Sequence, residues 1–150
     1  MLPVKSFLKR CRDEQIEIDA LSEKRAALWA SLLPKAVQPK EVDVQTSSPG
    51  DAMADVLAEV SELDRQIQAM VDNASRDHAR ALQIIGSIDK PVYRMVLELY
   101  YLSPGRMSWA QVSERMGYSE RQTYQLHGQA LLAAQKSAED SSESQYYPGV

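Results

Sequence analysis

The sequence predicts an all-α protein, in which a long antiparallel helical hairpin precedes a three-helix domain containing a helix-turn-helix. Three observations predict this fold. Apolar residues recur at intervals of three and four along most of the 150 residues. One segment with three prolines separates two such stretches. Near the C-terminus, two serine capping boxes stand eleven residues apart with a glycine between them.

The first predicted helix covers about residues 3–33. Nine positions form a seam with alternating spacings of three and four, and seven of them are apolar. The seam consists of Val4, Phe7, Cys11, Glu14, Ile18, Leu21, Arg25, Leu28 and Leu32. Pro34 ends this helix, and the proline-rich segment 34–50 is predicted to be a loop.

The second predicted helix covers residues 51–88, with Asp51 as its cap. Its seam has the same spacing, and an exposed stripe of that length would not be stable. We therefore expect residues 1–88 to fold as a hairpin that also forms homodimers or higher oligomers. Arg25 and Asp77 interrupt the two seams. They are expected near the ends of the contact, or paired with each other or with a second subunit.

Residues 89–138 form the predicted helix-turn-helix domain. Pro91 suits a first helical turn, and the helix that it starts runs to Leu102. Ser108 and Ser119 then begin two capping boxes, with Gly117 between them. The last helix is predicted to run from 119 to 138. The acidic tail 139–150 lacks an apolar period and is predicted to be disordered.

A helix that reads DNA buries one face and places hydrogen-bonding side chains on the other, within the major groove. The long or aromatic side chains that follow the turn match this requirement. Predicted base contacts are Glu120, Arg121, Gln122, Tyr124 and Gln125. Predicted phosphate contacts are Arg106, Ser108, Arg115, Ser119 and His127.

Charge and composition limit the function classes. The chain carries a net charge of −4, but residues 91–138 hold five Lys/Arg and three Glu, a net +2. A single cysteine and the lack of a long apolar run fit a cytoplasmic protein without a membrane segment. No phosphate loop, catalytic carboxylate pair or metal-ligand spacing is present. We therefore expect no enzyme activity, no cofactor and no metal.

The stretch 108–131 resembles the region-4 helix-turn-helix of bacterial sigma factors, which binds the promoter −35 element. The matching features are S-W-A-Q-V-S-E-R-M-G-Y-S and the following R-Q-T-Y-Q-L-H-G-Q-A-L. Over residues 1–136 the chain is similar to a family of small phage and prophage proteins. This similarity also rests on G-D-A-M-A-D at 50–55 and on the helix 91–102. The resemblance implies a DNA-binding regulator of phage transcription. A region-2 segment is not recognisable.

The leading hypothesis is therefore a sequence-specific transcription regulator in a bacterial host, bound to double-stranded DNA through helix 119–138. Two alternatives remain. A DNA-packaging protein similar to a phage small terminase subunit would also join a helix-turn-helix to a hairpin. A protein-protein adaptor would bind RNA polymerase or another regulator without DNA, and the modest +2 charge is compatible with it.

Overall fold

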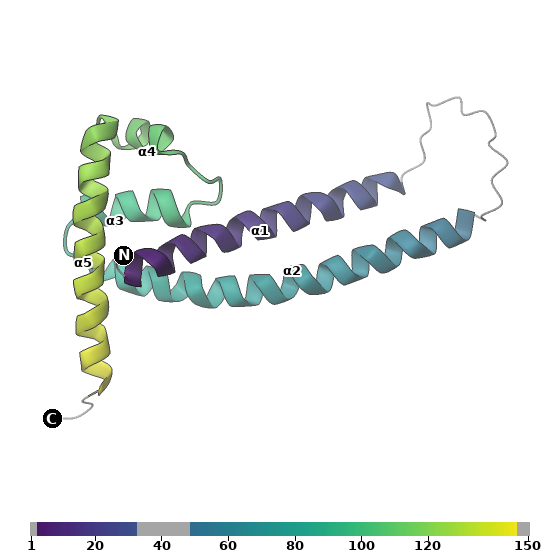
Figure 1. The fold of residues 1–150 in the computed structure, drawn as a ribbon, viewed down its shortest axis with the longest axis horizontal. Coiled ribbons are helices and arrows are strands. Elements are labelled where there is room, and N and C mark those ends of the chain that lie inside the picture. The colour runs from purple at the N-terminus through teal and green to yellow at the C-terminus, as the bar shows by residue number, and fades with distance from the viewer. Residues whose placement is uncertain (1–2, 33–48, 147–150) are drawn as a thin grey trace. The chain divides into compact units, whose positions relative to one another are not determined.

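The computed structural model describes residues 3–32 and 49–146, and every regular element among these residues is a helix (Figure 1). The all-α prediction is therefore confirmed. The elements in order are α1 (Pro3–Ser31), α2 (Pro49–Gly86), α3 (Pro91–Leu97), η1 (Glu98–Leu102), α4 (Trp109–Met116) and α5 (Glu120–Tyr146). Most of the predicted loop 34–50 lies outside the described residues.

The chain divides into two compact units, and the division differs from the predicted boundary at residue 88. One unit contains residues 1–16 and 73–150, and the other contains residues 17–72. Both long helices therefore contribute to both units. The beginning of α1 and the end of α2 belong with the C-terminal helices, because all of them share one apolar core.

The core of the larger unit forms around α5. Leu8, Ile85 and Leu97 are completely buried. Val4 and Cys11 join them from α1, and the remaining buried members of the cluster are Ala81, Ile84, Ile88, Val96, Tyr101, Val112, Ala130, Leu131 and Ala134. Burying one leucine side chain contributes about 2 kcal/mol. Two segments more than fifty residues apart in sequence are therefore held together chiefly by apolar burial.

The two charged residues on the predicted seams do not pair with each other. Asp77 accepts a hydrogen bond from Arg10 at 3.3 Å within the larger unit. Arg25 instead pairs with Asp64 within residues 17–72. Each of these two residues pairs with an oppositely charged residue of the neighbouring helix, so neither needs a partner from a second subunit. Because these pairs are exposed, each contributes only about 0.2–1 kcal/mol.

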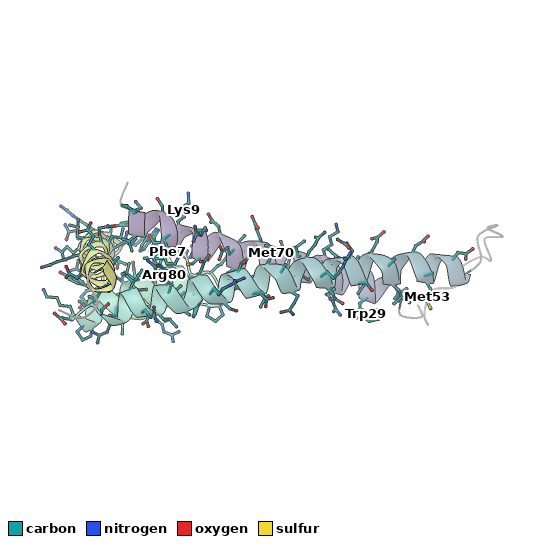
Figure 2. The ribbon with its side chains drawn as sticks, turned by 90° about the horizontal axis from the view of Figure 1, so that it is seen from below. Phe7, Lys9, Trp29, Met53, Met70 and Arg80 are labelled. Carbon is teal, nitrogen blue, oxygen red and sulfur yellow. The ribbon has the colours of Figure 1, made fainter. Side chains whose placement is uncertain are left out.

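In the unit of residues 17–72, α1 and α2 pack along a narrow apolar seam. Ile18, Val60 and Leu63 are its buried members. Trp29, Met53 and Leu57 are 44%, 49% and 40% exposed, although they are large apolar residues. Figure 2 shows Trp29 and Met53 toward the same end of these paired helices. This unit thus leaves large apolar side chains exposed beside its narrow seam.

The segment after α3 has the wider turn of a π-helix, η1, in place of the predicted continuous α-helix 91–102. A π-turn displaces backbone carbonyl oxygens from the regular ladder of hydrogen bonds. Arg12 donates from its guanidinium to the carbonyl oxygen of Tyr100, and the Ser103 hydroxyl donates to the carbonyl oxygen of Glu98 at 3.4 Å. The contact from Arg12 ties α1 to η1.

The turn between α4 and α5 has the predicted local chemistry. The Ser108 hydroxyl accepts from the Gln111 amide at 3.2 Å, and the Gln111 side chain accepts from the Ser108 amide at 2.9 Å. Gly117 then ends α4 with a left-handed φ of +78°. Its amide and that of Tyr118 both donate to the carbonyl oxygen of Ser113. This geometry reverses the chain over three residues before α5 begins at Glu120.

Helix α5 is longer than predicted. It continues through Tyr146, so residues 139–146 are helical and the prediction of a disordered tail was wrong for them. Gln135 donates to Glu139 at 2.9 Å, one helical turn further on. Local bonds of this kind support a polar helix without an apolar face. Residues 147–150 lie outside the described residues.

Two glycine substitutions should change stability in opposite directions. A Cβ at Gly117 or at Gly128 would meet no atom within 4 Å, so the two sites differ in backbone conformation alone. Gly117→Ala forces a side chain into the left-handed region and should lower the free energy of unfolding by about 1–2 kcal/mol. Gly128→Ala lies inside α5 and should raise it by about 0.5–1 kcal/mol.

Urea denaturation followed by circular dichroism measures both variants against the wild type. Equal effects of the same sign would contradict the conformation assigned to the turn.

Candidate nucleic-acid interface

Helix α5 presents one exposed stripe that runs along its side opposite the core. Residues separated by three or four positions share a helix face. Arg121, Gln125 and Gly128 are exposed, and Leu132 on the same face is 62% exposed. Thr123, Ala130 and Ala134 on the opposite face are completely buried. We call Arg121, Gln125, Gly128 and Leu132 the outer stripe of α5.

The predicted base-contacting residues are all exposed, but they occupy different positions around α5. Arg121 and Gln125 belong to the outer stripe. Glu120 and Tyr124 lie toward one flank, where Tyr124 contacts Trp109 with ring centres 5.2 Å apart. Gln122 lies toward the other flank, beside a shallow hollow lined by Tyr118, Gln125, Leu126 and Gln129. Arg121 and Gln125 are therefore the pair best placed to reach a partner together.

The role predicted for Gln122 conflicts with its cap. The side-chain oxygen of Gln122 accepts from the backbone amide of Ser119 at 3.1 Å. The backbone amide of Gln122 donates to the Ser119 hydroxyl at 3.2 Å. A glutamine that reads adenine needs both ends of its side-chain amide. In this conformation Gln122 offers only its NH₂ group, so it is better assigned to the helix cap than to base contacts.

The predicted phosphate contacts Arg106, Ser108, Arg115 and Ser119 are exposed around the turn and the two helix starts. Both serine hydroxyls already accept from a backbone amide in their capping boxes. The starts of α4 and α5 still present other backbone N–H groups and a partial positive charge, and both attract anions. Arg106 has a φ of +49°, which costs a residue with a side chain about 1 kcal/mol.

His127, a predicted phosphate contact, lies in an aromatic cluster. Its ring is half-buried among aromatic side chains, with its centre 4.5 Å from that of Trp109 and 5.6 Å from that of Tyr101. Its Nε2 atom lies 2.7 Å from the Tyr101 hydroxyl oxygen. Helical spacing places position 127 at the edge of the core, where an aromatic pocket receives its ring.

This environment changes the protonation of His127. Burial, with a smaller contribution from the positive charge of Lys5, lowers the pKa of His127 from 6.5 to about 4. The imidazole is therefore neutral at pH 7 and does not attract a phosphate. Burial also raises the pKa of Tyr101, so this hydroxyl keeps its proton. The pair is a neutral hydrogen-bonded contact that joins η1 to α5.

The sequence analysis did not anticipate the stack of planar groups beside His127. Tyr100 stacks on Trp109 with ring centres 3.9 Å apart and planes inclined by 14°. The Arg12 guanidinium lies 4.1 Å from the centre of the same Tyr100 ring. Two groups this close to one ring must occupy its opposite faces. Tyr100 is therefore held between α1 and α4, and no local pattern links Arg12 to either aromatic residue.

Charge is divided unevenly between the two units. Residues 1–16 and 73–150 hold 12 Lys/Arg and 10 Asp/Glu, a net +2. Residues 17–72 hold 5 Lys/Arg and 11 Asp/Glu, a net −6. The unit that carries the outer stripe of α5 is thus the positive one, although the whole chain is acidic. Phosphate groups would be attracted to this unit and repelled by the other.

Within the described ranges, no His, Cys, Asp and Glu side chains gather in a group of three that would hold a metal ion. In the same part of the chain, every helix is too short or too polar to cross a bilayer. The chain matches no protein-family profile, no curated protein and no solved structure.

The lowered pKa of His127 makes stability depend on pH in a defined window. An unfolded histidine has a pKa of about 6.5. Because the folded pKa is lower, at about 4, the unfolded chain takes up the proton first as the pH falls. The free energy of unfolding should therefore decrease from about pH 6.5 to about pH 4. We expect about 1–2 kcal/mol from His127, a value reduced for solvent screening of a partly exposed ring.

The variant His78→Gln leaves one imidazole in the chain, so its proton NMR titration reports His127 alone. The double variant His78→Gln/His127→Gln should lose this part of the pH dependence, while its carboxylates still titrate. A midpoint near 6.5 for His127 would contradict its burial in the aromatic cluster.

Proposed function

We propose that this chain is a sequence-specific DNA-binding regulator of phage or prophage transcription. In this proposal α4, the turn at Gly117 and α5 act as a helix-turn-helix similar to sigma region 4. The start of α5 enters the major groove. Arg121 pairs with guanine O6 and N7, and Gln125 pairs with adenine.

The observation that carries the proposal is the outer stripe of α5. Two capping boxes fix the starts of α4 and α5, so the side chains after the turn project from a rigid element. Gly128 has open space around its Cβ position, and therefore nothing within the described chain requires a glycine there. A close approach by a DNA backbone or base edge would require one, because a side chain on this face would hold the helix away.

The charge distribution is the second support. Only the unit that carries the outer stripe is positive, while residues 17–72 carry a net −6. A packaging protein and a regulator would both bind DNA with such a unit. No feature of the described residues favours ring assembly, so regulation is the simpler proposal. An adaptor without DNA would leave the asymmetry in charge unexplained.

Selection of bound sequences from a random double-stranded DNA library tests the proposal. The wild type should enrich a defined motif. Arg121→Ala/Gln125→Ala should lose it, since each good bidentate contact provides about 1–3 kcal/mol of discrimination. Arg65→Ala removes an exposed arginine from the acidic unit and is the matched control. It should select the wild-type motif.

Absence of enrichment at low salt would overturn DNA binding and favour the adaptor. Enrichment that survives the double substitution would place the reading surface elsewhere.

For residues 17–72 we propose homodimerisation, supported by the exposed apolar side chains Trp29, Met53 and Leu57. A twofold interface would bring the same patch of two copies together and cover it. Sedimentation equilibrium should give a dimer, and Trp29→Ser/Leu57→Ser should shift it toward the monomer. A wild-type chain that stays monomeric at every concentration would contradict this. The patch would then be assigned to RNA polymerase or another protein.

A further inference from the structure

The first turns of α1 belong to the same unit as the outer stripe of α5, although the sequence separates them by more than a hundred residues. The backbone amide of Val4 donates to the side-chain oxygen of Gln135 at 3.0 Å. Val4 and Leu8 are buried in the core that α5 completes. The start of α1 is therefore fixed directly against α5.

Helical geometry tells which side of α5 receives α1. Gln135 follows Arg121 by fourteen residues, which corresponds to a direction within about 40° of Arg121 and to about 21 Å along the axis. The start of α1 thus contacts α5 on the flank between its core face and its outer stripe, beyond the residues proposed to read bases. In the proposed complex the start of α5 lies in the major groove, which is about 12 Å wide, and a point this far along the helix would lie beside a flanking phosphate backbone.

Lys5 and Lys9 stand one turn apart on α1, and both are exposed. Figure 2 shows Lys9 on the side of α1 that faces away from α2, whereas Phe7 lies on the side toward it. Lys5 directly follows Val4, whose backbone amide is bonded to Gln135, so its backbone lies beside α5. Within residues 3–32 and 49–146, no ion pair neutralises either lysine.

Arg12 fixes this segment from the other end. Its guanidinium is engaged by the ring and the carbonyl oxygen of Tyr100, so it serves as a positioning residue rather than as a free charge. With Val4 held by Gln135 and Arg12 held by Tyr100, the turns that carry Lys5 and Lys9 are anchored at both ends.

We infer that Lys5 and Lys9 form a second DNA-contacting site, which binds the phosphate backbone beside the groove that α5 enters. This inference rests on the proposed DNA binding and adds a sequence-independent contact to it. Such a contact raises affinity for every sequence alike and fixes the register of α5. It also explains how a unit with a net charge of only +2 concentrates positive charge at the DNA.

The test measures the dissociation constant of the full chain for a DNA duplex between 50 and 200 mM salt. Three proteins are compared, namely the wild type, Lys5→Gln/Lys9→Gln and Lys24→Gln. Lys24 is an exposed lysine of the same helix that lies in the acidic unit, and it serves as the matched control. The duplex carries the motif that the wild type selects, and a scrambled duplex of equal length accompanies it.

Each phosphate contact contributes about 0.9 to the slope of log affinity against log salt. Losing two contacts should therefore make the slope shallower by about 2. Over this fourfold range of salt, the double variant should lose about tenfold less affinity than the wild type. Both duplexes should be affected equally, and the selected motif should not change. Lys24→Gln should match the wild type, and Lys5→Arg/Lys9→Arg should restore its slope.

An unchanged slope in the glutamine double variant would overturn the inference and leave the proposed function standing. An equal loss in Lys24→Gln would also overturn it, because the effect would then reflect net charge alone. A wild type that binds neither duplex would overturn the proposed function and this inference with it. Circular dichroism at each salt concentration checks that the variants remain folded.

Discussion

The structure depends on the burial of one side of α5 against the beginning of α1, the end of α2 and α3. Ala130, Leu131 and Ala134 contribute small and medium side chains that allow α5 to approach the beginning of α1 and the end of α2. The same burial leaves the opposite face of α5 exposed, so the core and the candidate interface have one cause. Exposed ion pairs such as Arg10–Asp77 only refine this arrangement, because each is weak beside a buried leucine.

Burial around α5 also decides which residues are chemically available. His127 and Arg12 both carry groups that bind phosphate when free. In the aromatic cluster, burial lowers the pKa of His127, and the Arg12 guanidinium stacks on Tyr100. Neither group is then free to bind phosphate. Lys5 and Lys9 remain exposed on the same unit. Their long, flexible side chains suit backbone contacts, which need charge more than fixed direction.

Local patterns predicted much of the fold. The spacing of apolar residues gave the helices, and the capping boxes with Gly117 located the turn within one residue. The boundary between units was not predictable in this way. It depends on contacts between Val4, Leu8 and α5, and no periodicity within α1 distinguishes a helix that continues a hairpin from one that also joins another core. The extension of α5 to Tyr146 is polar and has no apolar period, so the spacing of apolar residues does not predict it.

The sequence predicted which side chains of α5 are exposed better than it predicted what each of them contacts. Exposure of Arg121 and Gln125 follows from the burial of Thr123 and Ala130, which helical spacing indicates. Gln122 was assigned two roles that its single side-chain amide does not fulfil together. The contribution of α1 had a sequence signal, since Lys5, Lys9 and Arg12 share one helix face. The shared face indicates a contact surface only because α1 packs against α5, and the sequence alone does not reveal that packing.

The central claim is that one positive unit, assembled from residues 1–16 and 73–150, presents the outer stripe of α5 to DNA. Amide chemical-shift mapping by NMR during titration with the selected duplex tests it most directly. The account predicts the largest changes from Ser119 to Gly128, a second group around Lys5 and Lys9, and little change in residues 51–64. Changes confined to the acidic unit, or none at stoichiometric DNA, would contradict it.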